Sequence, residues 1–187
     1  MYLDPDDIRT LEDRYGTPRE IELREEFNMD GFNLLRWSME SGRAHDITLF
    51  IEKDGRYVVI QKPSYPSDAF RTPSGGVRRG ESIEAGAKRE AWEETGLEVE
   101  LTRYLLRVQA IFSCDGEAER WVSHVFLARA IGGQLDPKDR REISAARWAT
   151  LEELRGPIRH ALFASGLGGL RYRALLTDAA LDLLTSR

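Results

Sequence analysis

The sequence has little cysteine and no long apolar run. Cys114 is the only thiol among 187 residues, which excludes an intrachain disulfide and a cysteine-based zinc site. No hydrophobic stretch approaches the length of a membrane span. The N-terminus, Met-Tyr-Leu-Asp-Pro-Asp-Asp, is acidic where a secretory signal is basic. These absences predict a cytoplasmic protein that makes no contact with a membrane.

The sequence also lacks an excess of positive charge. It carries 27 Lys and Arg against 32 Asp and Glu, a formal net charge of −5. This balance argues against nucleic acid as a partner held by bulk electrostatics. Residues 1–43 contain eleven acidic and six basic residues, and the remainder is neutral. The acidity therefore belongs to the N-terminal segment.

Turn and capping signals divide the chain into an N-terminal extension, residues 1–43, and a main domain, residues 44–187. Asp4-Pro5 predicts a helix over 5–15, alternation predicts a strand over 19–25, and Asn28 or Asp30 caps a second helix ending at Gly42. The main domain begins with a hairpin turning at Asp54-Gly55. Its further elements are a loop at 61–80, a helix at 82–95, strands near 97–113, 120–131 and 143–148, a short helix from Thr150, and a helix at 170–185. Strands grouped around isolated helices predict an α+β fold with a mixed sheet.

Carboxylates interrupt the apolar face of the helix predicted at 82–95. On a helical wheel, Glu90 and Glu94 share a stripe with Ile83, Ala87 and Ala91. Glu93 lies beside these two glutamates, so three carboxylates point into one small volume. Like charges repel there unless a counter-charge lies among them. A divalent cation suits carboxylate oxygens, so the pattern indicates a site for Mg²⁺, or for Mn²⁺ as a substitute.

The loop before this helix favours phosphate. Residues 73–80 read Pro-Ser-Gly-Gly-Val-Arg-Arg-Gly, which lets the backbone turn tightly and directs the start of the helix toward an anion. Magnesium held by a few carboxylates keeps positions open for phosphate oxygens. The combination indicates chemistry on a phosphate substrate.

These residues form a recognisable motif. The run Gly75-x5-Glu81-x7-Arg89-Glu90-Ala91-x-Glu93-Glu94-x-Gly96-Leu97 resembles the Nudix box, Gly-x5-Glu-x7-Arg-Glu-U-x-Glu-Glu-x-Gly-U, where U is a bulky aliphatic residue. Ala91 is smaller than usual and is the one departure. The resemblance extends over about residues 45–155 and does not assign a subfamily.

The resemblance implies an α/β/α sandwich and a magnesium-dependent hydrolase that cleaves the diphosphate of a nucleoside diphosphate derivative by attack of water on phosphorus. It implies that Glu90, Glu93 and Glu94 are catalytic metal ligands and that Arg89 orients them. It also groups Glu81, which pairs with Arg89 or binds a further metal, and the loop residue Gly75 with the metal site.

Two assignments rest on position along the chain. The general base is either Glu90 or Glu142, since relatives use glutamates in the box or in the later loop. Lys62, Arg71 and Arg78 lie on the approach to the box and are candidates for binding substrate phosphate. Tyr65, Phe70 and Trp121 are candidates for stacking on a nucleobase.

The resemblance leaves the substrate open. No proline lies between Pro73 and Pro137, which speaks against an ADP-ribose-specific relative, and Tyr104 is too close to Gly96 for the dinucleoside-polyphosphate signature. Nucleoside triphosphates, nucleotide sugars and other small diphosphates remain. A non-catalytic nucleotide-binding or regulatory domain is the alternative function, and hydrolysis of RNA 5′ ends is a third. Homodimers are common in the family, so a homodimer is expected.

Overall fold

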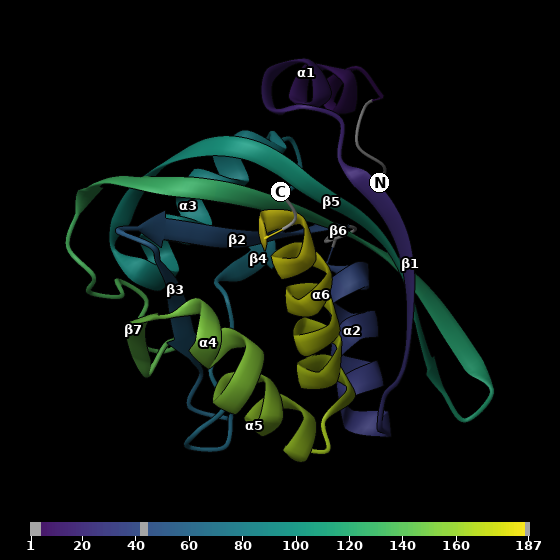
Figure 1. Cartoon of the computed structure of the whole chain (residues 1–187). Helices are drawn as coiled ribbons and strands as arrows, with labels where there is room; N and C mark the ends of the chain where they lie inside the picture. Colours follow the sequence, from purple (N-terminus) through teal and green to yellow (C-terminus); the bar gives the residue numbers. More distant parts are fainter. Residues whose placement is uncertain (1–4, 42–44, 186–187) are drawn as a thin grey trace.

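The computed structural model describes residues 5–41 and 45–185 (Figure 1). The elements are named in chain order. They are α1 Pro5–Tyr15, β1 Arg19–Glu26, α2 Met29–Glu40, β2 His45–Lys53, β3 Arg56–Gln61, β4 Ser74–Gly76, α3 Ile83–Thr95, β5 Leu97–Cys114, β6 Glu117–Gly133, β7 Ala145–Ala149, α4 Leu151–Glu153, the π-helix η1 Leu154–Ile158, α5 Arg159–Ala164 and α6 Gly168–Thr185. Among these residues, no helix meets the length and hydropathy of a membrane span.

A mixed seven-stranded sheet forms the middle of the molecule. Its strand order is β1-β5-β6-β2-β3-β7, and the short strand β4 pairs with β2. β1 runs parallel to β5, and β2 runs parallel to β6. The other paired strands are antiparallel, including the long β5–β6 ribbon. The predicted mixed sheet is therefore confirmed.

Helices cover both faces of this sheet. One face packs on apolar side chains of α1 and α3, among them Leu11, Ile83 and Ala87. The other face packs on α5, α6 and the inner side of α2, through residues such as Leu162, Leu176 and Leu35. Figure 1 shows α5 and α6 on one side of the sheet and α3 on the other. The arrangement is the expected α/β/α sandwich.

Local signals in the sequence account for most element boundaries. Asp54 and Gly55 both take positive φ, 53° and 72°, as a tight hairpin between β2 and β3 requires. Of the two caps proposed for α2, Asn28 is the one used, because its side chain accepts a hydrogen bond from the Gly31 amide at 2.9 Å. Asp4 and Gly42 lie outside the described residues.

Several elements differ from the sequence prediction, among them β6, which runs from Glu117 to Gly133 rather than over about 120–131. β4 lies inside the region predicted as a loop, and β7 begins at Ala145 rather than at Ile143. The helix capped by Thr150 continues to Ala164 through the π-helix η1, which accommodates Pro157. α6 begins at Gly168, two residues earlier than predicted. The errors at β4, β7 and η1 concern short or proline-containing segments, where periodicity is weak. α6 begins with Gly168 and Gly169, which add nothing to an apolar pattern.

The N-terminal extension is built into the sheet. β1 pairs with β5 from Arg19 to Glu26 without a break in register. α6 packs against β1, and Arg171 of α6 donates to Glu25 of β1 at 2.8 Å. The division at residues 43/44 stays a prediction, but both ends of the chain contribute to the walls around the site described next.

Candidate active site

α3 packs on the sheet and carries Glu90, Glu93 and Glu94. Ser82 caps the helix by accepting a hydrogen bond from the Ala85 amide, and Gly96 ends it with a left-handed φ of 74°. Ile83, Ala87 and Ala91 are buried against β2 and β5. Small alanines let the helix approach the sheet closely. The carboxylates on the same stripe are thereby brought to the edge of the core.

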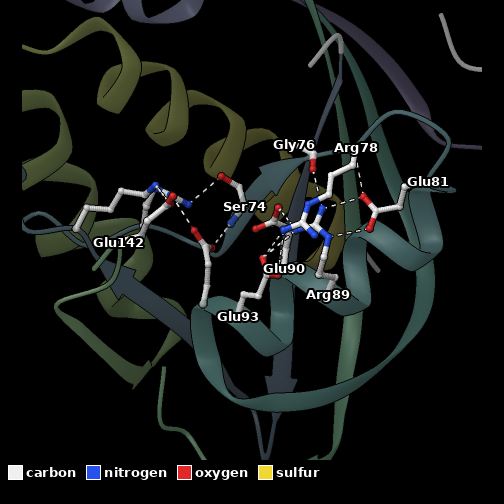
Figure 2. Close-up of polar contacts among 11 residues, drawn as sticks. Ser74, Gly76, Arg78, Glu81, Arg89, Glu90, Glu93 and Glu142 are labelled. Carbon is white, nitrogen blue, oxygen red and sulfur yellow. Dashed lines mark hydrogen bonds and ion pairs between the residues drawn. The ribbon is translucent and has the colours of Figure 1, made fainter. Parts of the chain in front are cut away.

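Arg89 is the centre of the polar network. Its Nε and Nη2 donate to the two oxygens of Glu81 at 2.7 and 2.8 Å. Nη1 donates to Glu90 at 2.6 Å and to Glu93 at 2.9 Å, and Nη2 also reaches the Gly76 carbonyl at 2.9 Å. Figure 2 shows Arg89 lying between Glu81 and the other two glutamates. Arg89 thus contacts all three of these glutamates, and its orienting role stays a prediction.

The network shifts the acid–base equilibria of the carboxyl groups around Arg89. Hydrogen bonds from Arg89 lower the pKa of Glu81, against a smaller effect of burial. Burial raises the pKa of Glu90, Arg89 opposes that rise, and the charges of Glu94 and Glu93 add to it. The charges of Glu93 and Glu94 thus disfavour ionisation of Glu90, while Arg89 favours it.

Glu94 is the most deeply buried of the three, with only 3% of its surface exposed. It accepts a hydrogen bond from the Ser74 amide at 2.7 Å and lies 3.4 Å from Arg71. Burial raises the pKa of Glu94, while the charges of Arg71 and Lys62 lower it. A buried carboxylate with these partners is fixed in place before any ligand binds.

Arg71 is itself buried, with 4% of its surface exposed. It donates to the Tyr65 hydroxyl at 3.1 Å, to the Thr72 carbonyl at 2.8 Å and to the Ser74 hydroxyl at 2.8 Å. These contacts commit most of its donors to the protein and position Glu94. Its predicted role as a substrate ligand stays a prediction.

Gly75 explains how Glu90 reaches its position. A Cβ built on Gly75 would lie 1.9 Å from Cδ of Glu90 and 2.0 Å from its Oε2. Only a residue without a side chain allows this carboxylate to lie against β4. Gly75 therefore leaves the space that the Glu90 carboxylate occupies, and its grouping with the metal site stays a prediction.

The remaining predicted residues lie around the same opening. Lys62 donates to Glu142 at 2.9 Å. This contact joins a phosphate-binding candidate to a candidate general base. Arg78 donates to Glu93 at 3.1 Å, and its side chain is exposed. Both cations are thus paired with carboxylates that line the site.

A single cavity of about 820 Å³ connects these groups. Lys62, Arg71, Arg78, Glu90, Glu93, Glu94 and Glu142 all line it. Tyr65 and Trp121, two of the three proposed stacking residues, also line it, whereas Phe70 lies in a different depression beneath Arg147. The far part is formed by apolar residues of α2, β5, β6 and α6, including Leu34, Leu35, Phe112, Trp121 and Leu170.

Two functional candidates were missed by sequence reasoning. Asp46 of β2 and Arg173 of α6 line the cavity and form an ion pair at 2.6 Å. Asp46 follows the predicted start of a strand, and Arg173 lies within a predicted helix far from the motif. Only the fold brings these two positions, 127 residues apart, together.

The donor types suit a hard divalent cation. Glu90, Glu93 and Glu94 supply carboxylate oxygens at one cavity wall, and Gly75 leaves room for one of them beside the backbone. In the described part of the chain, no three acidic side chains converge into a ready-made metal-binding group. Arg89 occupies the oxygens of Glu90 and Glu93 instead. The residues fit a metal that competes with Arg89 for these oxygens.

Comparison with known proteins places this geometry in context. The NUDIX domain model matches residues 41–166. An RNA pyrophosphohydrolase of Sphingopyxis alaskensis is 31% identical over 132 residues, covering 62% of this chain and 84% of that protein. An NAD-capped RNA hydrolase, NudC, of Photobacterium profundum is 30% identical over 108 residues, covering 58% of this chain. The chain spans only 38% of the length of that second relative.

Solved structures agree on the fold. A NUDIX hydrolase from Nitrosomonas europaea superposes with a TM-score of 0.54 at 21% identity, covering 78% of this chain and 97% of that one. The domain match covers most of the chain and includes every residue of the motif. The chain belongs to the Nudix hydrolase family.

Proposed function

We propose that this protein is a magnesium-dependent hydrolase that cleaves the diphosphate linkage of a nucleoside diphosphate derivative by attack of water on phosphorus. The observation that carries the proposal is the cavity in which Glu90, Glu93 and Glu94 lie beside the cations Lys62 and Arg78. Carboxylates at one wall suit a metal, and cations at the same opening suit phosphate oxygens. The relatives named as pyrophosphohydrolases support the same reaction class.

Glu90, Glu93 and Glu94 would hold the metal, with Glu81 acting through Arg89. When bound, Mg²⁺ would neutralise negative charge on the diphosphate. Mn²⁺ prefers similar oxygen ligands and could replace it. Arg89 keeps the carboxylates apart and aligned, since it contacts both Glu90 and Glu93 through one nitrogen. The site is thus partly preorganised before substrate binds.

We assign the general base to Glu90. Its side chain lies in the cavity wall with 13% of its surface exposed, and burial raises its pKa in the metal-free site. Glu142 is the alternative. Its side chain is 57% exposed and is held by Lys62, so we assign it to placing Lys62 beside the phosphate. Arg78, which is more exposed, is the second phosphate ligand.

The apolar part of the cavity supports an organic group on the substrate. Leu35 and Trp121 line it, and the Tyr65 ring lies nearer the charged end. An aromatic or aliphatic surface of this kind suits a nucleoside better than a bare phosphate. Asp30 of α2 also lines this part and disfavours a further polyanion. This favours a small nucleotide derivative over a long RNA chain.

The test is a phosphate-release screen of the full chain with Mg²⁺, Mn²⁺ or EDTA. The panel contains nucleoside triphosphates, nucleotide sugars, ADP-ribose, dinucleotides, dinucleoside polyphosphates and a 5′-triphosphate RNA oligonucleotide. Glu93→Gln/Glu94→Gln is expected to abolish turnover. Glu84→Gln is the matched control, because Glu84 lies on the same helix but pairs with Arg14 and Lys88 away from the cavity.

Metal-dependent turnover of a small diphosphate that is lost only in the double variant supports the proposal. Turnover confined to the RNA oligonucleotide would favour hydrolysis of RNA 5′ ends. A folded protein that binds nucleotides and turns over nothing in the panel would favour the binding-domain alternative.

A further inference from the structure

Arg173 lies on α6, beyond the residues matched by the domain model, yet it lines the cavity. Its Nη2 donates to Asp46 at 2.6 Å and its Nη1 donates to the Thr48 hydroxyl at 2.9 Å. The Asp46 side chain is 5% exposed and the Arg173 side chain is 19% exposed. A buried acid on the sheet therefore holds a guanidinium whose remaining surface faces open space.

Anchoring of α6 does not by itself account for this arrangement. Arg159 of α5 already binds Asp178 of α6 through both carboxylate oxygens, at 3.0 and 2.8 Å. Arg171 joins the same helix to β1. By contrast, Asp46 uses only Oδ2 toward Arg173, and its Oδ1 is buried without a partner in the described residues. The Asp46–Arg173 contact thus leaves one buried carboxylate oxygen without a partner in the described residues.

The contacts leave donors on Arg173. A guanidinium has five N–H groups, and the described residues engage two of those on Arg173. Asp46 and Thr48 fix the plane of the group, so little side-chain freedom is lost when a ligand binds. A planar fork with free N–H groups matches the geometry of phosphate oxygens.

The position of Arg173 also connects it to the glutamate cluster. Arg173 on α6 and Glu94 on α3 both line the same cavity. An anion held between α3 and α6 would contact both the metal-binding carboxylates, through the cation, and the guanidinium.

We propose that Arg173 forms an anion subsite that binds a phosphate oxygen of the substrate diphosphate, with Asp46 and Thr48 as positioning residues. The proposal rests on the proposed function for the identity of the ligand. It assigns to the C-terminal helix a part of the substrate site that lies outside the Nudix box. The ligand class is a diphosphate.

The first test measures binding without hydrolysis. Methylenediphosphonate, a diphosphate mimic that water does not cleave, is titrated calorimetrically into the full chain with Mg²⁺. Arg173→Gln is expected to weaken binding at least about tenfold, and Arg173→Lys, which keeps charge without the fork, is expected to be intermediate. Arg159→Gln is the matched control, because it removes an ion pair of α6 that does not face the cavity.

The outcomes separate a ligand from a structural anchor. Equal affinity in Arg173→Gln and the unsubstituted protein overturns the proposal, as does absence of binding by the unsubstituted protein. An equal loss in Arg159→Gln also overturns it, because loosening of α6 would then explain the effect. Thermal unfolding of both variants shows how far each one weakens the attachment of α6.

A kinetic test addresses the same residue during turnover. With a substrate found in the hydrolysis screen, Arg173→Gln is expected to raise KM about tenfold and to change kcat less, as loss of uniform phosphate binding requires. A fall in kcat with KM unchanged contradicts this. Arg173-dependent binding of methylenediphosphonate by a protein that hydrolyses nothing would support the subsite and reject the proposed function, so the two failures are distinguishable.

Discussion

Arg89 and Glu81 face each other through two parallel hydrogen bonds, Nε to Oε1 at 2.7 Å and Nη2 to Oε2 at 2.8 Å. This bidentate contact fixes the plane of the guanidinium. The remaining nitrogen, Nη1, is then directed at Glu90 and Glu93. Glu81 therefore contacts Glu90 and Glu93 only indirectly, through Arg89, among the described hydrogen bonds.

Arg89→Lys is expected to lower metal-dependent activity about 10- to 100-fold, the usual cost of losing a residue that orients metal ligands. Lysine keeps the charge but cannot contact three carboxylates in one plane. The measurement is the Mg²⁺ concentration that gives half-maximal activity, which should rise. Lys88→Gln, one position earlier and paired with Glu84 in the described part of the chain, is the control. Unchanged metal dependence in Arg89→Lys would contradict the orienting role.

Gly75→Ala is expected to reduce activity about 100-fold with little change in the free energy of unfolding. The new Cβ would overlap the Glu90 carboxylate, which is the flexible end of a side chain and can move at low cost. A displacement of about 1 Å at a reacting group can cost this much in rate. Gly156→Ala is the control, because a Cβ there meets nothing within 4 Å. Full activity in Gly75→Ala would show that the position of Glu90 is unimportant.

Substitution of the two base candidates separates their roles. Glu90→Gln is expected to lower kcat about 100- to 10,000-fold, the range for loss of a general base. Glu142→Gln is expected to act mainly on KM, because it releases Lys62. The pH–rate profile of each variant decides the assignment, since the variant that lacks the base loses its acidic limb. Loss of that limb in Glu142→Gln would transfer the role to Glu142.

Most of the local chemistry of the site was predictable, because α3 carries its own signals. Ser82 and Gly96 define its two ends. The glutamates on its apolar face predict a metal site without knowledge of the other elements. β4 was not predictable, since three residues of Ser and Gly have no strand periodicity and pair only because β2 lies beside them.

Long-range contacts account for the other omissions. Arg71 lies in a polar loop, where arginine is usually exposed. In the structure it is buried because it donates hydrogen bonds to Tyr65, Ser74 and Glu94. Arg173 lies on a helix with no motif, and its relation to Asp46 depends on how α6 crosses the sheet. Neither relationship has a signature within a sequence window.

A buried histidine predicts how stability depends on pH. His124 bonds the Tyr104 hydroxyl and lies 3.1 Å from a ring nitrogen of His45. Burial and the neighbouring His45 lower the pKa of His124 to about 3, against about 6.5 in an unfolded chain. Between these values the unfolded state binds a proton that the native state does not, so stability is full above about pH 6.5 and falls toward pH 3.

Thermal unfolding between pH 7 and pH 5 tests this, because most carboxyl groups titrate below that window. The unfolding temperature should fall with pH, and the fall should be shallower in His124→Gln. His160→Gln is the control, since His160 is exposed and should leave the slope unchanged. A slope that is the same in all three proteins would show that His124 does not titrate differently on folding.

The most direct test of the proposed reaction is hydrolysis in H₂¹⁸O with Mg²⁺, using a substrate identified by the screen, followed by mass spectrometry of the products. Attack of water on phosphorus places one ¹⁸O in a phosphate group of one product and none in the organic group. EDTA and Glu93→Gln/Glu94→Gln should each abolish the labelled product. Label in the organic group, or labelled phosphate formed equally well by the double variant, would contradict the account.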